Sequence, residues 1–122
     1  DWPMMNGEFL PSESFDYRPF WTNFFENPAL VQFNHRMLGY VLMSVGIIAW
    51  FKSRNLAHRK LRISFKAILI MLLIQMFIGI LTVLYAAPWY IAIVHQLGAI
   101  FLLILILQAR FIACYPQEQS LR

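Results

Sequence analysis

Two histidines inside long apolar segments are the residues in this sequence best suited to do chemistry. His35 lies seven residues after Pro28, and His95 lies seven residues after Pro88. An ionisable side chain without a partner is costly in lipid, so a histidine there indicates a functional site. Imidazole also binds haem iron, which accepts one axial ligand on each face. We therefore interpret the pair as the axial ligands of one haem.

Three apolar helices are expected to position these histidines. Asn27 suits the N-cap of a helix and Pro28 its first turn, so the first helix is predicted at about 28–51. The next two are predicted at about 64–86 and 88–111. Each is long enough to cross a bilayer at about 1.5 Å of rise per residue. With 60% hydrophobic and 13% charged residues, the chain is predicted to be an all-α integral membrane protein with three transmembrane helices.

The predicted helices place both histidines at the same depth. The first and third helices run in the same direction, and seven residues of helix rise about 10 Å. Small residues follow each histidine by one turn, namely Gly39 after His35, and Gly98 with Ala99 after His95. Their small size leaves room for a macrocycle, although glycines also serve close helix packing in membranes.

Other polar residues near the pair allow more than one interpretation. Arg36 is predicted either to pair with haem propionates or to extend to lipid phosphates. Gln75 and Gly79 lie on one stripe of the middle helix. His58 lies in a basic connector, where it is expected to be solvated. Cys114 is the only cysteine, so it cannot form an intrachain disulfide.

The charges predict the orientation in the membrane. The connector after the first helix, counted through Lys66, carries six basic residues and no acidic one, whereas residues 1–26 carry five acids and one base. Basic loops favour the cytoplasmic or matrix side, so the N-terminal loop is expected outside and the C-terminus inside. The net charge of +4 is thus a topology signal, and no nucleic-acid partner is expected.

The chain is divided into two regions by this interpretation. Residues 1–26 form an aromatic-rich loop, expected along the membrane surface or over a pocket, because Trp and Tyr favour the interface. Residues 27–122 form the transmembrane haem-binding region. Zinc or copper at the histidine pair is disfavoured, because no Cys, Asp or Glu lies at that depth to complete a site.

Several motifs in order along the chain resemble one family. Phe25–Pro28 with Val31–Arg36 is similar to the FEN…VQF-D-HR stretch of heme A synthase, with Asn34 where the family often has Asp. Gln75–Leu84 looks like its Q…LGI-TLL helix, and His95–Ala99 like its HQ-x-GA element. The loop from Pro3 to Pro11 resembles its FPLM-G…IP loop. These matches extend over about residues 2–107.

The resemblance implies a function beyond what the residues indicate. Such enzymes oxidise the C8 methyl group of haem O to the formyl group of haem A for cytochrome c oxidase. They have two four-helix halves, of which the C-terminal half holds haem b. By this resemblance, His35 and His95 are the haem b iron ligands, and the chain is part of a four-helix haem-binding bundle. The substrate half would be an N-terminal part of the protein or a partner chain.

Alternative functions remain open on the sequence. The chain begins with Asp1 and covers only the last three helices of such an enzyme, so it is expected to be a fragment, a split gene product or a structural relic. A non-catalytic haem-binding or structural subunit of a larger respiratory assembly is the second interpretation, and a homo-oligomer is also possible. A two-histidine electron-carrying cytochrome is disfavoured, because only one haem fits. Membrane lipid is an expected partner, in the mitochondrial inner or bacterial plasma membrane.

Overall fold

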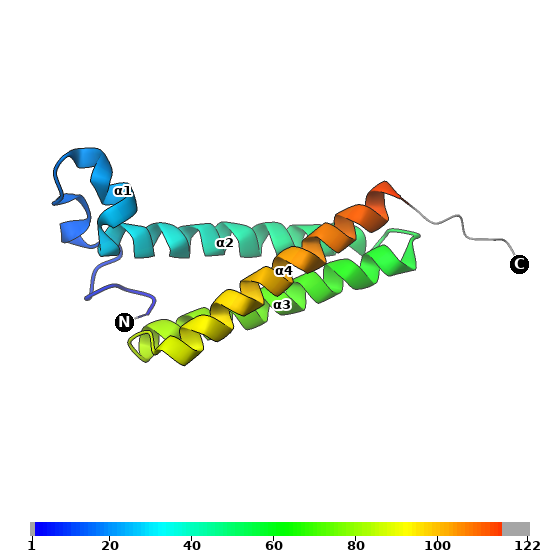
Figure 1. Ribbon diagram of the computed structural model, residues 1–122. Helices are drawn as coiled ribbons and strands as arrows, with labels where there is room; N and C mark the ends of the chain where they lie inside the picture. Colours follow the sequence, from blue (N-terminus) through cyan, green and yellow to red (C-terminus); the bar gives the residue numbers. More distant parts are fainter. Residues whose placement is uncertain (1, 116–122) are drawn as a thin grey trace, which may run out of the picture.

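The computed structural model describes residues 2–115, and their regular elements are all helical (Figure 1). Two short 3₁₀ helices, η1 and η2, and a four-residue helix, α1, precede three helices of 26 residues each. The bounds are η1 Ser12–Phe15, η2 Phe20–Thr22, α1 Asn23–Glu26, α2 Pro28–Ser53, α3 Arg59–Leu84 and α4 Trp89–Cys114. The all-α fold is as the sequence predicts.

Helix α2 begins where the sequence predicts, and for the predicted reason. The Asn27 side chain accepts hydrogen bonds from the main-chain N–H groups of Ala29 and Leu30, at 3.0 and 3.4 Å. These are two of the N–H groups that a helix start leaves without partners. Pro28 occupies the first turn, where its missing N–H costs nothing.

Helix α3 begins five residues earlier than the expected start at about 64, because His58 caps it. Its Nδ1 accepts a hydrogen bond from Leu61 N–H at 3.3 Å, and its carbonyl accepts one from Arg62 N–H at 3.2 Å. His58, expected to be solvated in the connector, is half-buried there and is also the N-cap of α3. Part of the basic connector, from Arg59 onwards, belongs to the first turns of α3.

The connection between α3 and α4 is longer than expected, because it extends from residue 85 to residue 88. Ala86 and Ala87 have φ values of 56° and 53°, in the left-handed region, which ends α3 at Leu84 rather than at about 86. Pro88 is then the N-cap of α4, and Trp89 is its first residue.

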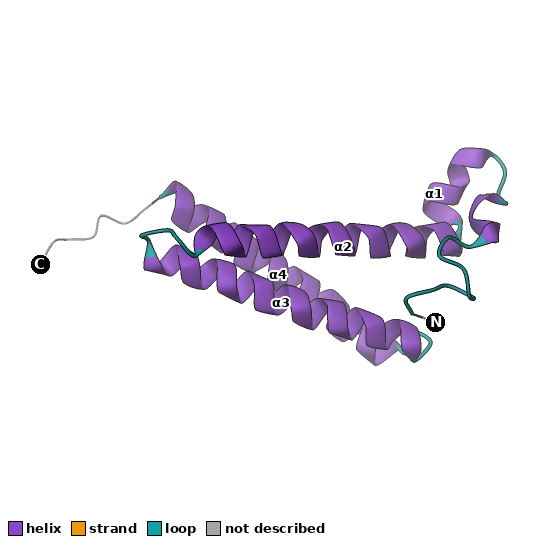
Figure 2. Ribbon diagram, turned by 180° about the vertical axis from the view of Figure 1, so that it is seen from behind, coloured by secondary structure: helices purple, strands orange, loops and turns teal. Residues whose placement is uncertain are grey.

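The three long helices are arranged with α3 packed against both α2 and α4. Helices α2 and α3 meet near the Arg54–His58 connection and diverge towards the end that carries the N-terminal segment and the α3–α4 turn (Figures 1 and 2). The buried core lies where they are close, and consists of Met43, Ile68, Leu72, Leu102 and Ala109.

Most other apolar side chains on these helices are exposed. Leu38, Phe77 and Leu97 are 69%, 63% and 60% exposed. Helices α3 and α4 are long and apolar enough to cross a membrane, and α2 has the same length but carries Asn34, His35 and Arg36 in its first half. Such wide apolar surfaces suit lipid or further helices rather than water. The chain is an integral membrane protein.

The N-terminal segment is folded around two buried asparagines. Asn23 is completely buried; its Oδ1 accepts from Tyr17 N–H at 2.9 Å, and its Nδ2 donates to the carbonyls of Tyr17 and Phe20 at 3.0 and 2.7 Å. Asn27 Nδ2 donates to the Glu13 carbonyl at 2.7 Å and to Asn23 Oδ1 at 3.1 Å. These bonds attach the aromatic loop to the start of α2.

Candidate haem site

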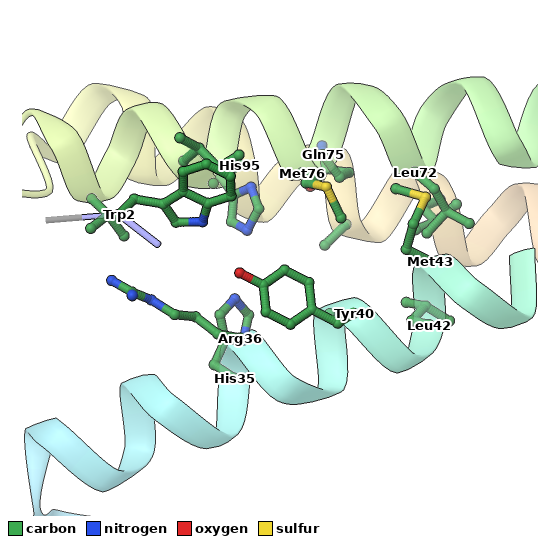
Figure 3. A pocket seen from close by; sticks show the side chains of 16 residues that line it. Trp2, His35, Arg36, Tyr40, Leu42, Met43, Leu72, Gln75, Met76 and His95 are labelled. Atoms are coloured by element: carbon green, nitrogen blue, oxygen red, sulfur yellow. The ribbon is translucent and has the colours of Figure 1, made fainter. Parts of the chain in front are cut away.

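His35 and His95 come together, as their spacing predicts. His35 extends from α2 and His95 from α4, and the rings point toward each other at the diverging end of the helices (Figure 3). Their centroids are 6.1 Å apart and their planes are inclined at 81°. His35 is exposed, whereas His95 is half-buried. The two helices contribute one imidazole each at one level of the structure.

An apolar cavity of about 200 Å³ surrounds the two rings. All three long helices and the N-terminal segment line it, and most of the lining side chains are aliphatic, aromatic or methionine. The lining residues are Trp2, His35, Arg36, Gly39, Tyr40, Leu42, Met43, Leu72, Gln75, Met76, Gly79, Ile80, Val83, His95, Ala99 and Leu102.

The small residues near the histidines have different surroundings. Gly39 lines the cavity, and a Cβ placed on it would meet no atom within 4 Å. Gly98 does not line the cavity, although the sequence predicts room for a macrocycle there. A Cβ on Gly98 would instead overlap the Gln75 amide. Gly98 therefore makes room for a neighbouring side chain, because α3 and α4 pack directly against each other.

Arg36 binds the N-terminal segment across the edge of the cavity. Its Nη1 donates hydrogen bonds to the carbonyls of Pro3 and Met4, at 3.2 and 3.0 Å. These contacts hold the segment that carries Trp2, and Trp2 lines the same cavity as His95 (Figure 3). The aromatic loop is expected either along the membrane surface or over a pocket. The part of the loop that carries Trp2 lies over the pocket. Neither expectation for Arg36, propionate or lipid phosphate, is tested.

Sequence reasoning missed several residues of the cavity. Tyr40 of α2 extends between the helices beside His35 (Figure 3). It is four residues after Arg36, so helical spacing was a signal that could have placed it near the site. Met43 and Met76 also line the cavity, and both pack in or against the buried core between the helices. No sequence signal singles out Trp2 among the many aromatic residues of the loop.

The site also contains buried polar atoms without hydrogen bonds to the described residues. These are Nδ1 of His95 and both amide atoms of Gln75, which is 7% exposed. Buried polar groups are normally satisfied, so each such group needs an explanation. They lie where α3 and α4 touch, directly beside the cavity.

The geometry of the histidine pair fits a haem. A metal–imidazole bond is about 2 Å long, so two imidazoles on opposite sides of one iron have ring centres roughly 6 Å apart. The observed 6.1 Å agrees with that arrangement. The apolar lining suits a porphyrin, and Gly39 leaves open space beside one ligand. Within residues 2–115, no group of three or more His, Cys, Asp or Glu residues comes together to hold a bare metal ion.

Comparison with known proteins gives one consistent family. The family model described as cytochrome oxidase assembly protein matches residues 1–107. Proteins named heme A synthase are similar over 99–100% of this chain: that of Dinoroseobacter shibae is 52% identical, that of Ruegeria pomeroyi 49% and that of Paracoccus denitrificans 46%.

The match covers only part of these relatives. The chain spans about a third of their length, 32% in each of the three. No solved structure was found that matches it. Since the family model covers most of the chain, the sequence resemblance stated above is confirmed. The chain belongs to the cytochrome oxidase assembly protein family that includes the heme A synthases.

Proposed function

We propose that this chain is the haem b-binding C-terminal part of a bacterial heme A synthase. The observation that carries the proposal is the facing pair of His35 and His95, 6.1 Å apart in an apolar cavity. Relatives named heme A synthase support the enzyme, and their bacterial sources favour the bacterial plasma membrane over the mitochondrial inner membrane. The overall reaction would be oxidation of the haem O C8 methyl group to the formyl group of haem A.

Within that reaction, the residues of this chain would hold a cofactor rather than act on substrate. His35 and His95 would bind the iron through one imidazole nitrogen each. The bound haem would supply one-electron chemistry. The aliphatic lining from Leu42, Ile80 and Leu102 would exclude water from the bound group, and the bonds from Arg36 to Pro3 and Met4 would hold Trp2 at the cavity edge. No residue of this chain is proposed as catalytic.

The exposure of His35 favours a further covering element. A haem between α2 and α4 would have one side without protein contact from the described residues, and the outer faces of these helices are apolar. We propose that the rest of the synthase covers this side and supplies the substrate haem site. This is why the synthase is favoured over a free-standing structural subunit.

The proposal is tested by changing each ligand in the full-length protein. Purified from membranes, the protein should show a low-spin bis-imidazole absorption spectrum. His35→Ala and His95→Ala should each abolish the part of that spectrum due to this site, because one imidazole does not complete the axial pair. His58→Ala, at the N-cap of α3 and outside the cavity lining, is the control and should leave the spectrum intact. A spectrum unaffected by both ligand variants would contradict the proposal.

A further inference from the structure

The contact between α3 and His95 has features that haem ligation alone does not explain. Gly79 of α3 lies directly against the imidazole: a Cβ there would be 3.1 Å from Cε1, 3.6 Å from Nε2 and 3.7 Å from Nδ1 of His95. The closest of these distances is shorter than ordinary van der Waals contact, so a Cβ at position 79 would require the ring to move by a few tenths of an ångström. The absence of a side chain at Gly79 therefore sets how His95 lies.

Gln75 lies one helical turn before Gly79 and has the second feature. In an α-helix its carbonyl accepts a hydrogen bond from the N–H of Gly79. A carbonyl oxygen has two lone pairs and can accept a second hydrogen bond. With no Cβ at Gly79, this oxygen is open to the imidazole, and the main chain of Gln75 is close enough to His95 to interact with it electrostatically.

The third feature is the missing partner of His95. Its Nδ1 is buried and makes no hydrogen bond of good geometry to the described residues. A histidine that binds a metal through one nitrogen normally donates the other N–H to a carbonyl, carboxylate or water, which fixes the tautomer and the ring orientation. The Gln75 main chain, which interacts with the ring, offers a carbonyl acceptor.

We propose that Gly79 and Gln75 of α3 position the His95 imidazole for iron, with Nδ1–H donating to the Gln75 carbonyl and Nε2 left as the ligand. This inference rests on the proposed haem site. In this arrangement α3, which carries no iron ligand, sets the orientation of the ligand His95 on α4. The Gln75 side chain, unlike its main-chain carbonyl, packs against Gly98 of α4.

The test compares glycine variants in the full-length haem-loaded protein. The readouts are haem affinity and the low-spin ferric EPR signal, assigned to this site by its loss in His35→Ala and His95→Ala. Gly79→Ala should shift the g values of that signal and weaken haem binding by about 10- to 100-fold, the usual effect of losing a partner of a metal-bound histidine.

Gly46→Ala is the matched control for helix packing. A Cβ at Gly46 would overlap the Leu72 side chain between α2 and α3, away from both histidines, so this variant should leave the EPR signal unchanged. Unchanged g values in Gly79→Ala or an equal shift in Gly46→Ala would each overturn the inference. If instead no EPR signal depends on His35 and His95, the proposed haem site itself is wrong.

Discussion

Gly39 and Gly79 are both glycines of the cavity, yet their surroundings assign them different roles. Gly79 is in contact with the His95 ring, whereas the position of a Cβ on Gly39 is open space. Packing among the described residues therefore does not require glycine at position 39. A small residue there suits a ligand in the cavity.

This difference predicts the effect of adding a side chain at Gly39. Gly39→Leu should fold normally, since a helix interior favours Leu over Gly by roughly 0.5–1 kcal/mol. It should nevertheless lose the haem, because the side chain occupies the space beside His35. Absorbance of the purified full-length protein measures the haem, and thermal unfolding measures the stability.

The matched control for that experiment is Gly39→Ala. A single methyl group fits the open space and should keep most of the haem while gaining the same helix propensity. Full haem retention in Gly39→Leu would show that the macrocycle does not lie beside this turn of α2.

At the scale of elements, the start of α2 connects the loop to the site. Asn27 is 2% exposed and combines a helix cap with a bond to the Glu13 carbonyl. Eight and nine residues later, the same helix presents His35 to the cavity and Arg36 to the Pro3 and Met4 carbonyls. Asn27 and Arg36 thus attach the N-terminal loop to α2 at two points, and the second point adjoins His35.

Loss of the Asn27 side chain should therefore reduce stability measurably. Asn27→Ala removes the cap and leaves buried main-chain groups without partners, which should cost about 1–2 kcal/mol of unfolding free energy. The measurement is the unfolding midpoint of the full-length protein in detergent. Asn55→Ala, at an exposed position of the connector, should change that midpoint little. Equal midpoints in the two variants would contradict the capping role.

At the scale of the whole molecule, charge and apolar surface determine how the chain sits in the membrane. The six basic residues from Lys52 to Lys66 are at one end of the helices, and the acidic N-terminal segment is at the other. The histidine cavity lies towards the acidic end (Figures 1 and 3). By the positive-inside rule the haem would lie near the periplasmic surface.

Site-directed labelling tests this orientation. In a full-length variant without other cysteines, Ala57→Cys in the connector should react with a membrane-impermeant maleimide only from the cytoplasm. Ser12→Cys in the exposed part of the loop should react only from the periplasm. A separate variant keeps the natural Cys114 as its only cysteine. Cys114 is exposed at the end of α4 and should label like Ala57→Cys. The reverse pattern would contradict the predicted topology.

The sequence alone determined the helical fold, the cap at Asn27 and the meeting of His35 with His95. These follow from local rules, because hydrophobic length, capping chemistry and helical rise are fixed by neighbouring residues. The early start of α3 escaped prediction, because the capping role of His58 depends on one side-chain rotamer rather than on composition.

Only the tertiary structure decided which small residues face the cavity and which side chains surround the ligands. Gly39 and Gly98 each lie within one turn of a histidine, yet one faces open space and the other the Gln75 amide. That difference depends on how α3 packs against its two neighbours. The placement of Trp2 depends on bonds from Arg36 to a segment more than 30 residues away. Neither is encoded in a local pattern, because both result from contacts between elements distant in the chain.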